Sequence, residues 1–225
     1  MSQLTTLLFD FDGTLVESTS KHTEAIIRAF LEHVPNSEVD PDERKAYIGT
    51  DYSVTIRGML AQRGIDDDEL VQKIVERIDV HYDALHSGIS TVAGSPEFVR
   101  AVHAAGFRLG VVSGAGKKHI LQTLDQLKLR DLFEIVVAWE DVDAYKPHPE
   151  PYLKAMRELG VQASETLAFE DTPVGVEAAW VAEIPVVGIL TTFNDEELHK
   201  AARTVRDFTE LSITDLHTLH QNRDV

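Results

Sequence analysis

The chain has 225 residues, 43% hydrophobic and 26% charged, which is typical of a soluble globular protein with one large domain or a core domain plus an insert. Its formal net charge of -17 argues against nucleic acid and anionic membrane surfaces as partners, and the lack of cysteine excludes disulfides, cysteine-bound zinc and thiol catalysis. The apolar run from Leu7 is too short for a signal peptide or a membrane span, so we expect a cytoplasmic protein.

Apolar segments typical of strands alternate with segments of helical character through most of the chain. This alternation favours a parallel sheet with helices on both faces. We therefore predict an α/β fold with a Rossmann-like, doubly wound parallel sheet as its core. The predicted strands are Thr6–Phe11, Arg108–Ser113, Glu134–Ala138, Thr166–Phe169 and Pro185–Ile189.

The region from about Glu17 to His86 interrupts this pattern, because it contains helical segments and no convincing strand. Apolar residues recur at helical spacing in Ser20–Val34, Tyr52–Arg63 and Asp67–Leu85. We predict an all-helical domain, residues 17–87, inserted after the first strand. Residues 1–16 and 88–225 would then form the α/β core.

The first predicted strand runs into two aspartates that are one residue apart. Asp10 and Asp12 would share a side of an extended strand, at the end where open α/β sheets bind ligands. Two such carboxylates repel each other, and a cation would relieve the repulsion. One can act as a nucleophile while its neighbour transfers protons. The alternative is that both are turn residues before Gly13.

Three further loops follow predicted strands and carry other functional groups. Ser113–Lys117 holds a hydroxyl and two glycines, Ala144–Pro149 holds a lysine, and Glu170–Gly175 holds two acids. In a doubly wound sheet these loops reach the same edge as the aspartates of the first strand. Carboxylates suit Mg²⁺, whereas a hydroxyl, free backbone amides and a lysine suit phosphate oxygens.

This combination is what phosphoryl transfer to an aspartate needs. Asp10 would attack phosphorus, and Asp12 would protonate the leaving oxygen and later deprotonate the attacking water. Mg²⁺ would offset the repulsion between anions, while Lys146 and Ser113 would balance charge on the transferring group. Gly114 would permit close backbone approach to an anion. The alternative is that Lys146 is a solvated surface residue and the Ser113 hydroxyl has no role.

Four motifs in this order resemble those of the haloacid dehalogenase superfamily, which contains phosphatases and phosphomutases. The resemblance covers nearly the whole chain, and the helical insert lies where the C1-type cap of subfamily I lies. The chain looks most like the subgroup of β-phosphoglucomutase, phosphoglycolate phosphatase and phosphonoacetaldehyde hydrolase. The matching residues are Asp10-x-Asp12-Gly13-Thr14, Ser113, Lys146-Pro147-x-Pro149 and Glu170-Asp171-x-x-x-Gly175.

The resemblance implies a Mg²⁺ site formed by acids of the first and fourth motifs: Asp10, Asp12, Glu170 and Asp171. We expect Asp171 to contact the metal directly or nearly so, and Glu170 to have a positioning role. The alternative is that Glu170 and Asp171 only cap the helix that starts near Pro173. In the dehalogenase branch the acid at Asp12 is missing, so its presence here favours phosphate chemistry.

Further residues are expected to contact the substrate: Gly13, Thr14, His22, Gly114 and Lys117. His22 follows Asp10 by the same offset as a histidine beside the catalytic acid of β-phosphoglucomutase, although a surface histidine is equally plausible. Lys117 could also merely begin a helix.

The insert departs from two members of the subgroup. Gly49–Asp51 resembles a substrate-specificity loop, but Tyr52 stands where β-phosphoglucomutase has an arginine that holds a second phosphate. Phosphonoacetaldehyde hydrolase needs a cap lysine, and none lies between Thr50 and Gln72. Arg57 could replace the missing arginine from the next helical turn, or could be a solvated residue.

These observations predict a Mg²⁺-dependent phosphatase that hydrolyses a small phosphorylated metabolite, a sugar phosphate or a phosphoglycolate-like compound, through an aspartyl-phosphate at Asp10. The alternative is a phosphomutase of the β-phosphoglucomutase type, and a third hypothesis is a non-catalytic protein that binds a phosphorylated metabolite. We expect no nucleic-acid or membrane partner, and a monomer or weak dimer.

Overall fold

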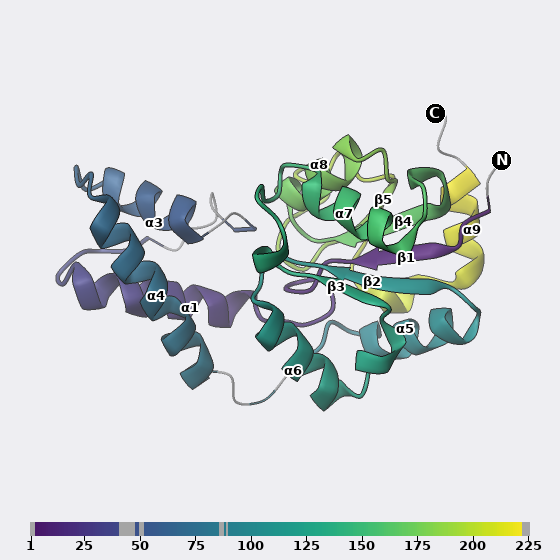
Figure 1. Ribbon diagram of the computed structural model, residues 1–225, viewed down its shortest axis with the longest axis horizontal. Coiled ribbons are helices and arrows are strands. Elements are labelled where there is room, and N and C mark those ends of the chain that lie inside the picture. The colour runs from purple at the N-terminus through teal and green to yellow at the C-terminus, as the bar shows by residue number, and fades with distance from the viewer. Residues whose placement is uncertain (1–2, 41–47, 50–51, 86–87, 89, 222–225) are drawn as a thin grey trace. The chain divides into compact units, whose positions relative to one another are not determined.

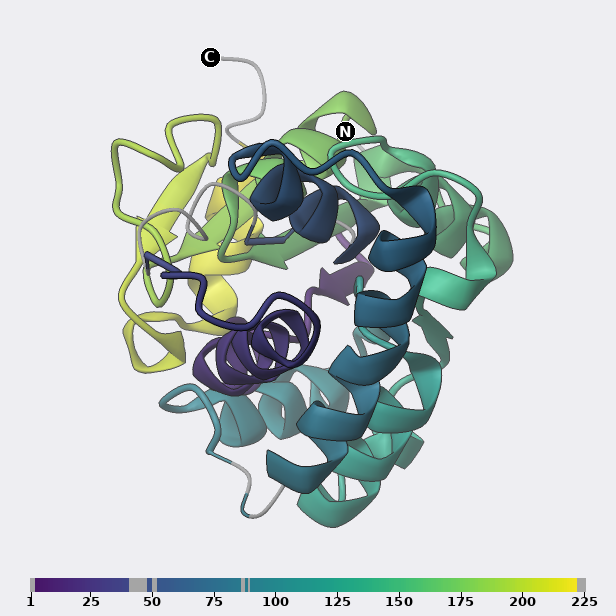
Figure 2. The same ribbon diagram turned by 90° about the vertical axis from the view of Figure 1, so that its left-hand side faces the viewer.

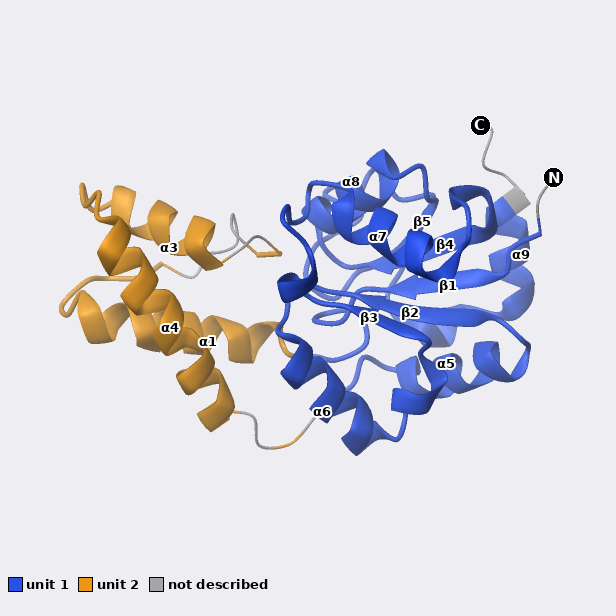
Figure 3. Cartoon of the chain, in the orientation of Figure 1, with its two compact units in different colours: residues 1–17, 90–225 blue, residues 18–89 orange. Residues whose placement is uncertain are grey.

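The computed structural model describes residues 3–40, 48–49, 52–85, 88 and 90–221 of the chain (Figure 1). The chain divides into two compact units, which Figure 3 shows in different colours. The α/β unit comprises Met1–Glu17 and Ser90–Val225, and the helical unit comprises Ser18–Ile89. The role of the helical unit as a cap stays a prediction.

The α/β unit is built on a parallel sheet of six strands in the order β3-β2-β1-β4-β5-β6. This confirms the predicted α/β fold with a doubly wound parallel sheet. Each central strand is a short apolar run with both faces covered, as parallel sheets require. The strands are β1 Thr6–Phe9, β2 Arg108–Val112, β3 Ile135–Val137, β4 Thr166–Glu170, β5 Val186–Ile189 and β6 Arg203–Val205.

Helices cover both faces of this sheet, with α7 and α8 on one side and α5 and α6 on the other (Figure 1). Successive residues of β1 pack on opposite faces of the sheet, because side chains alternate along a strand. Leu8 packs in the cluster with α7 and α8, whereas the Phe9 ring stacks on Phe169, 4.6 Å between centroids, on the other face. The helices of this unit are α5 Ser95–Ala104, α6 Lys117–Leu127, α7 Glu150–Leu159, α8 Pro173–Val181 and α9 Ile213–Gln221.

The last part of the sheet differs from the prediction. The described segment 190–202, which follows β5, forms turns and contains no helix, and β6 is not among the predicted strands. Arg203–Val205 has only three residues, and the first two are polar and half-buried, as an edge strand permits. A strand this short carries no periodic signal.

The strand order reverses between β1 and β4, where a doubly wound sheet opens a ligand site. After β3 the chain crosses back over β1 and enters the sheet as β4. The two strands pair in register, Phe9 opposite Phe169. Asp10 and Glu170 therefore lie side by side at the carboxyl edge of the sheet.

The helical unit contains α1 Thr19–His33, α3 Tyr52–Ala61 and α4 Asp68–Leu85, within a few residues of the predicted bounds. Figure 2 looks along α1 (purple), and α4 (blue) runs past it. One apolar face of each helix is buried in a common core that includes Phe30, Ile56 and Ile78. In the described part of the chain, no helix combines the length and the apolar character needed to cross a membrane.

Candidate active site

Asp10 begins the site at the end of β1. Its backbone amide donates to the Phe169 carbonyl at 2.9 Å, which continues the pairing of β1 with β4 for one residue. Its side chain is buried. Burial and the Glu170 carboxylate raise the pKa of Asp10 well above its usual value, and the Lys146 ammonium opposes this shift.

Lys146 joins the loop after β3 to the ends of the neighbouring strands. Its buried ammonium donates to Asp10 Oδ1 at 2.7 Å, to Glu170 Oε1 at 2.6 Å and to the Val112 carbonyl at 2.8 Å. These three acceptors use all three of its N–H groups. Although burial alone would lower the pKa of Lys146, the two carboxylates raise it, so the side chain stays charged. The surface alternative for this lysine is therefore wrong.

Glu170 is the last residue of β4, and both of its carboxylate oxygens accept hydrogen bonds from other side chains. Oε1 accepts from Lys146 and from the Tyr152 hydroxyl at 2.7 Å, while Oε2 lies 3.4 Å from the Thr172 hydroxyl. Gly175 makes room for this carboxylate, since a Cβ there would lie 2.1 Å from its carbon. Tyr152 is not among the predicted site residues, because an aromatic residue on the apolar face of a helix indicates core packing.

Asp171 has a different environment, because the Thr192 hydroxyl interacts with its carboxylate while Oδ2 has no hydrogen bond of normal geometry within the described residues. The side chain is fully buried, and the Thr14 hydroxyl lies 3.4 Å from Oδ1. Burial and Glu170 raise the pKa of Asp171 to about 8. Gly13, with φ +85°, lies so close that a Cβ would be 2.0 Å from Oδ2.

Three of the carboxylates could hold a cation. Oxygen atoms of Asp10, Glu170 and Asp171 lie within 4.8 Å of one another, and all three residues are buried. The Lys146 ammonium carries one positive charge and pairs with two of these acids. If all three acids were ionised, the cluster would therefore keep an excess of negative charge. Together with Asp171 Oδ2, which has no hydrogen bond of normal geometry in the described residues, this oxygen-only set fits Mg²⁺.

Asp12 is half-buried in the turn after β1 and pairs with Val16 through an isolated bridge. Its carboxylate contributes to the raised pKa of Asp171, so the two acids interact electrostatically. Asp12 is not one of the three clustered carboxylates, and its predicted share in holding the metal stays a prediction.

Ser113 and Gly114 lie at the end of β2. The Ser113 amide donates to the Val137 carbonyl at 2.9 Å, and its hydroxyl accepts from the Ala115 amide at 3.0 Å. Gly114 is exposed and has open space around its Cα. One hydrogen bond to β3 and one within the loop thus fix the position of Ser113, while Gly114 stays accessible to an anion.

Lys117 contacts two acids of the segment after β3, which were not among its predicted partners. Its ammonium pairs with Asp141 at 2.7 Å, and its amide donates to both Glu140 carboxylate oxygens at 3.1 Å. These bonds tie the start of α6 to the loop after β3. Its predicted substrate contact stays a prediction, and the structure gives it a role in joining two loops.

His22 belongs to the helical unit. Its Nδ1 lies 2.7 Å from the Tyr52 hydroxyl, and its ring stacks on Tyr82 with 4.0 Å between centroids. The predicted specificity loop includes Thr50 and Asp51, which lie outside the described residues. The predicted roles of His22 and of this loop stay predictions.

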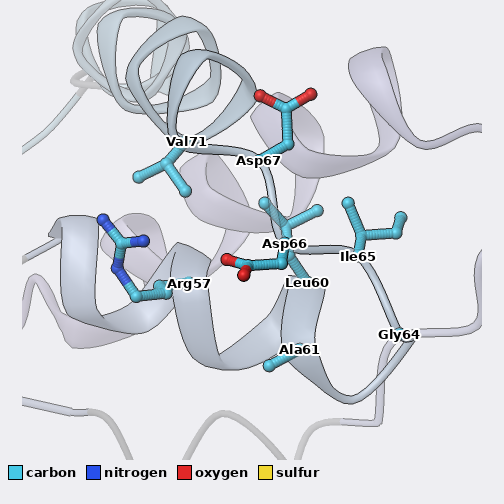
Figure 4. A pocket seen from close by; sticks show the side chains of 8 residues that line it. All are labelled: Arg57, Leu60, Ala61, Gly64, Ile65, Asp66, Asp67 and Val71. Carbon is cyan, nitrogen blue, oxygen red and sulfur yellow. The ribbon is translucent and has the colours of Figure 1, made fainter.

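The helical unit also has a pocket of about 360 Å³, between α3 and the start of α4 (Figure 4). Leu60, Ile65 and Val71 supply apolar walls, and Arg57 lies at one side. The Arg57 guanidinium pairs with Asp68 of the same unit, and both side chains are largely exposed. Asp66 and Asp67 also line the pocket, so it combines carboxylates with apolar walls.

Comparisons with known proteins agree with this geometry. A family model described as haloacid dehalogenase-like hydrolase matches residues 7–189. A validoxylamine A 7'-phosphate phosphatase of Streptomyces hygroscopicus subsp. limoneus is 32% identical over 208 residues, which cover 91% of this chain and 94% of that protein. A phosphoglycolate phosphatase of Colwellia psychrerythraea is 30% identical over 193 residues, or 84% of this chain and 85% of that protein.

A solved structure shows the same fold. The β-phosphoglucomutase of Clostridium difficile superposes with a TM-score of 0.85 at 20% identity, over 97% of this chain and 98% of that chain. The family model spans the strand of Asp10, the loop of Lys146 and the acids of β4. The chain therefore belongs to the haloacid dehalogenase-like hydrolases and is an enzyme of that family.

Proposed function

We propose that this hydrolase is a Mg²⁺-dependent phosphatase that acts on a small phosphorylated metabolite, a sugar phosphate or a phosphoglycolate-like compound. The observation that carries the proposal is the buried set of Asp10, Glu170 and Asp171 around the Lys146 ammonium. Such a set of acids is costly to bury unless a cation offsets its excess negative charge. The relatives named as phosphatases support this choice of reaction.

Asp10 is the proposed nucleophile. Lys146 engages its Oδ1, which orients the carboxylate and directs the other oxygen, Oδ2, to attack phosphorus. A bond then forms between this oxygen and phosphorus while the ester P–O bond of the substrate breaks. The product is an aspartyl-phosphate, and water later attacks its phosphorus and releases Asp10.

Asp12 is the proposed acid and base. It gives its proton to the leaving oxygen in the first step and takes a proton from the attacking water in the second. The proton that Asp12, half-buried in the turn after β1, takes up in the second step restores the acid for the next cycle. Ser113 and the exposed Gly114 amide are proposed to receive the phosphate oxygens.

Asp10 and Asp171 are the proposed direct ligands of Mg²⁺, because Glu170 already has hydrogen bonds to both oxygens and Asp171 Oδ2 has none of normal geometry. Glu170 instead orients Lys146. When bound, Mg²⁺ would offset negative charge on the phosphoryl group and on the carboxylates.

Phosphate release from a panel of phosphorylated metabolites, measured with and without Mg²⁺, tests the proposal. The panel contains phosphoglycolate, hexose phosphates and nucleoside monophosphates, with the Asp10→Asn variant as the control for contaminating phosphatase. Mg²⁺-dependent release from one or a few compounds, absent in the variant, would support it. No release from any compound would contradict it.

One arm of the same assay separates phosphatase from phosphomutase. The enzyme is incubated with β-glucose 1-phosphate and glucose 1,6-bisphosphate, and both glucose 6-phosphate and free phosphate are followed. Formation of glucose 6-phosphate with little free phosphate would replace the phosphatase proposal by a mutase. We expect free phosphate, because Tyr52 stands where β-phosphoglucomutase has the arginine that holds a second phosphate.

A further inference from the structure

The hydroxyl group of Tyr152 contacts the same carboxylate oxygen that holds Lys146. Tyr152 Oη donates to Glu170 Oε1 at 2.7 Å, and Lys146 Nζ donates to that oxygen at 2.6 Å. We propose that Tyr152 is a positioning residue, whose hydroxyl fixes Glu170 so that the Lys146 ammonium stays shared between Glu170 and Asp10. This inference rests on the proposed function, because Lys146 matters there through its contact with the nucleophile.

The contacts of Lys146 make its position sensitive to Glu170. Its three N–H groups are divided among two carboxylates and the Val112 carbonyl, so the ammonium lies where three attractions balance. The Tyr152 hydroxyl takes up part of the negative charge on Oε1 and thereby weakens the pull of Glu170 on Lys146. Without that hydroxyl, Glu170 attracts the ammonium more strongly, and the bond to Asp10 lengthens.

Tyr152 is itself well placed to act in this way. It is fully buried on α7, within the apolar cluster that includes Leu8 and Val112. Its ring also lies under the ammonium, with Lys146 Nζ 5.3 Å from the ring centroid. A phenylalanine would keep the packing and the ring contact and would remove only the hydrogen bond to Glu170.

The Tyr152→Phe variant of the full chain tests the role through steady-state kinetics on the best substrate of the panel. We expect kcat to fall about tenfold with KM changed less than about twofold, because the nucleophile and its lysine are misplaced while the groups proposed to bind phosphate are intact. Met156→Ala, one turn further along α7, is the packing control. It should lower thermal stability without a comparable fall in kcat.

A double-mutant cycle with Lys146→Ala tests whether Tyr152 acts through the lysine. Where the lysine is absent, Tyr152→Phe should change kcat less than about twofold. A second cycle uses the urea midpoint of unfolding and needs no turnover. The two substitutions should be non-additive there as well, because both side chains bind one oxygen.

The outcomes separate this inference from the proposed function. If the wild-type protein releases phosphate and Tyr152→Phe has wild-type kcat, the positioning role is wrong and the proposed function stands. Additive effects in the urea cycle would also overturn the role. If no phosphorylated compound is turned over, the proposed function fails, and the proposed role of Tyr152 in that reaction fails with it, whatever the urea cycle shows.

Discussion

Gly175→Ala is the substitution for which the structure gives the clearest expectation. Gly175 lies in the first turn of α8, and an added Cβ would lie 2.1 to 2.2 Å from all three atoms of the Glu170 carboxylate group. That group cannot move aside freely, because Lys146 and Tyr152 both bind it. Overpacking of this kind costs about 1–3 kcal/mol, and alanine recovers up to about 1 kcal/mol of helix propensity.

The net loss should therefore be about 1–2 kcal/mol, which for a chain of this size lowers Tm by about 2–8 °C. Calorimetry of the metal-free protein measures the shift, and kcat should fall about tenfold or more because Lys146 follows Glu170. Gly114→Ala is the stability control, since nothing lies within 4 Å of its added Cβ. A Gly175→Ala protein as stable as wild type would show that Glu170 does not lie against this helix.

Three further results are expected from the buried charges. Lys146→Ala should reduce turnover severely and cost about 3–5 kcal/mol of unfolding free energy, since Asp10 and Glu170 lose their shared partner; a rate near wild type would mean that the lysine does not serve the reaction. The folded-state pKa of Asp171, about 8, exceeds the unfolded value, so without metal its contribution to stability is complete below about pH 4 and is lost as the pH rises toward 8. The urea midpoint of unfolding is measured in EDTA between about pH 5 and 8, where it should fall less steeply with pH in Asp171→Asn than in wild type. The same dependence on pH in both proteins would contradict the raised pKa. Mg²⁺ should raise the Tm of wild type more than that of Asp171→Asn, and equal shifts would remove Asp171 from the metal site.

The parallel sheet could be predicted because its central strands are apolar runs followed by loops rich in polar residues. The same reasoning placed Asp10, Lys146 and Asp171 at one edge, although Lys146 and Asp10 are 136 residues apart. It failed at β6, where Arg203 and Thr204 have no apolar pattern. In the helical unit the periodicity located α4, and the buried residues of that helix include Val71, Ile74 and Ile78.

What the sequence could not predict are contacts set by the packing of distant elements. Tyr152 is part of the apolar face of α7, and only its place opposite β4 shows that its hydroxyl reaches Glu170. The ion pair of Lys117 with Asp141 likewise depends on how the loop after β3 folds beside α6. The close approach of Gly13 to Asp171 Oδ2 is likewise a contact between residues far apart in the sequence.

The central claim is that Asp10 carries the phosphoryl group, and trapping of the intermediate tests it most directly. The enzyme is mixed with its best substrate and Mg²⁺, quenched in acid, reduced with borohydride and digested for mass spectrometry. Reduction of an aspartyl-phosphate yields homoserine, so the account predicts homoserine at position 10 in wild type and none in Asp10→Asn. Turnover without homoserine at that position, or with homoserine elsewhere, would contradict the account.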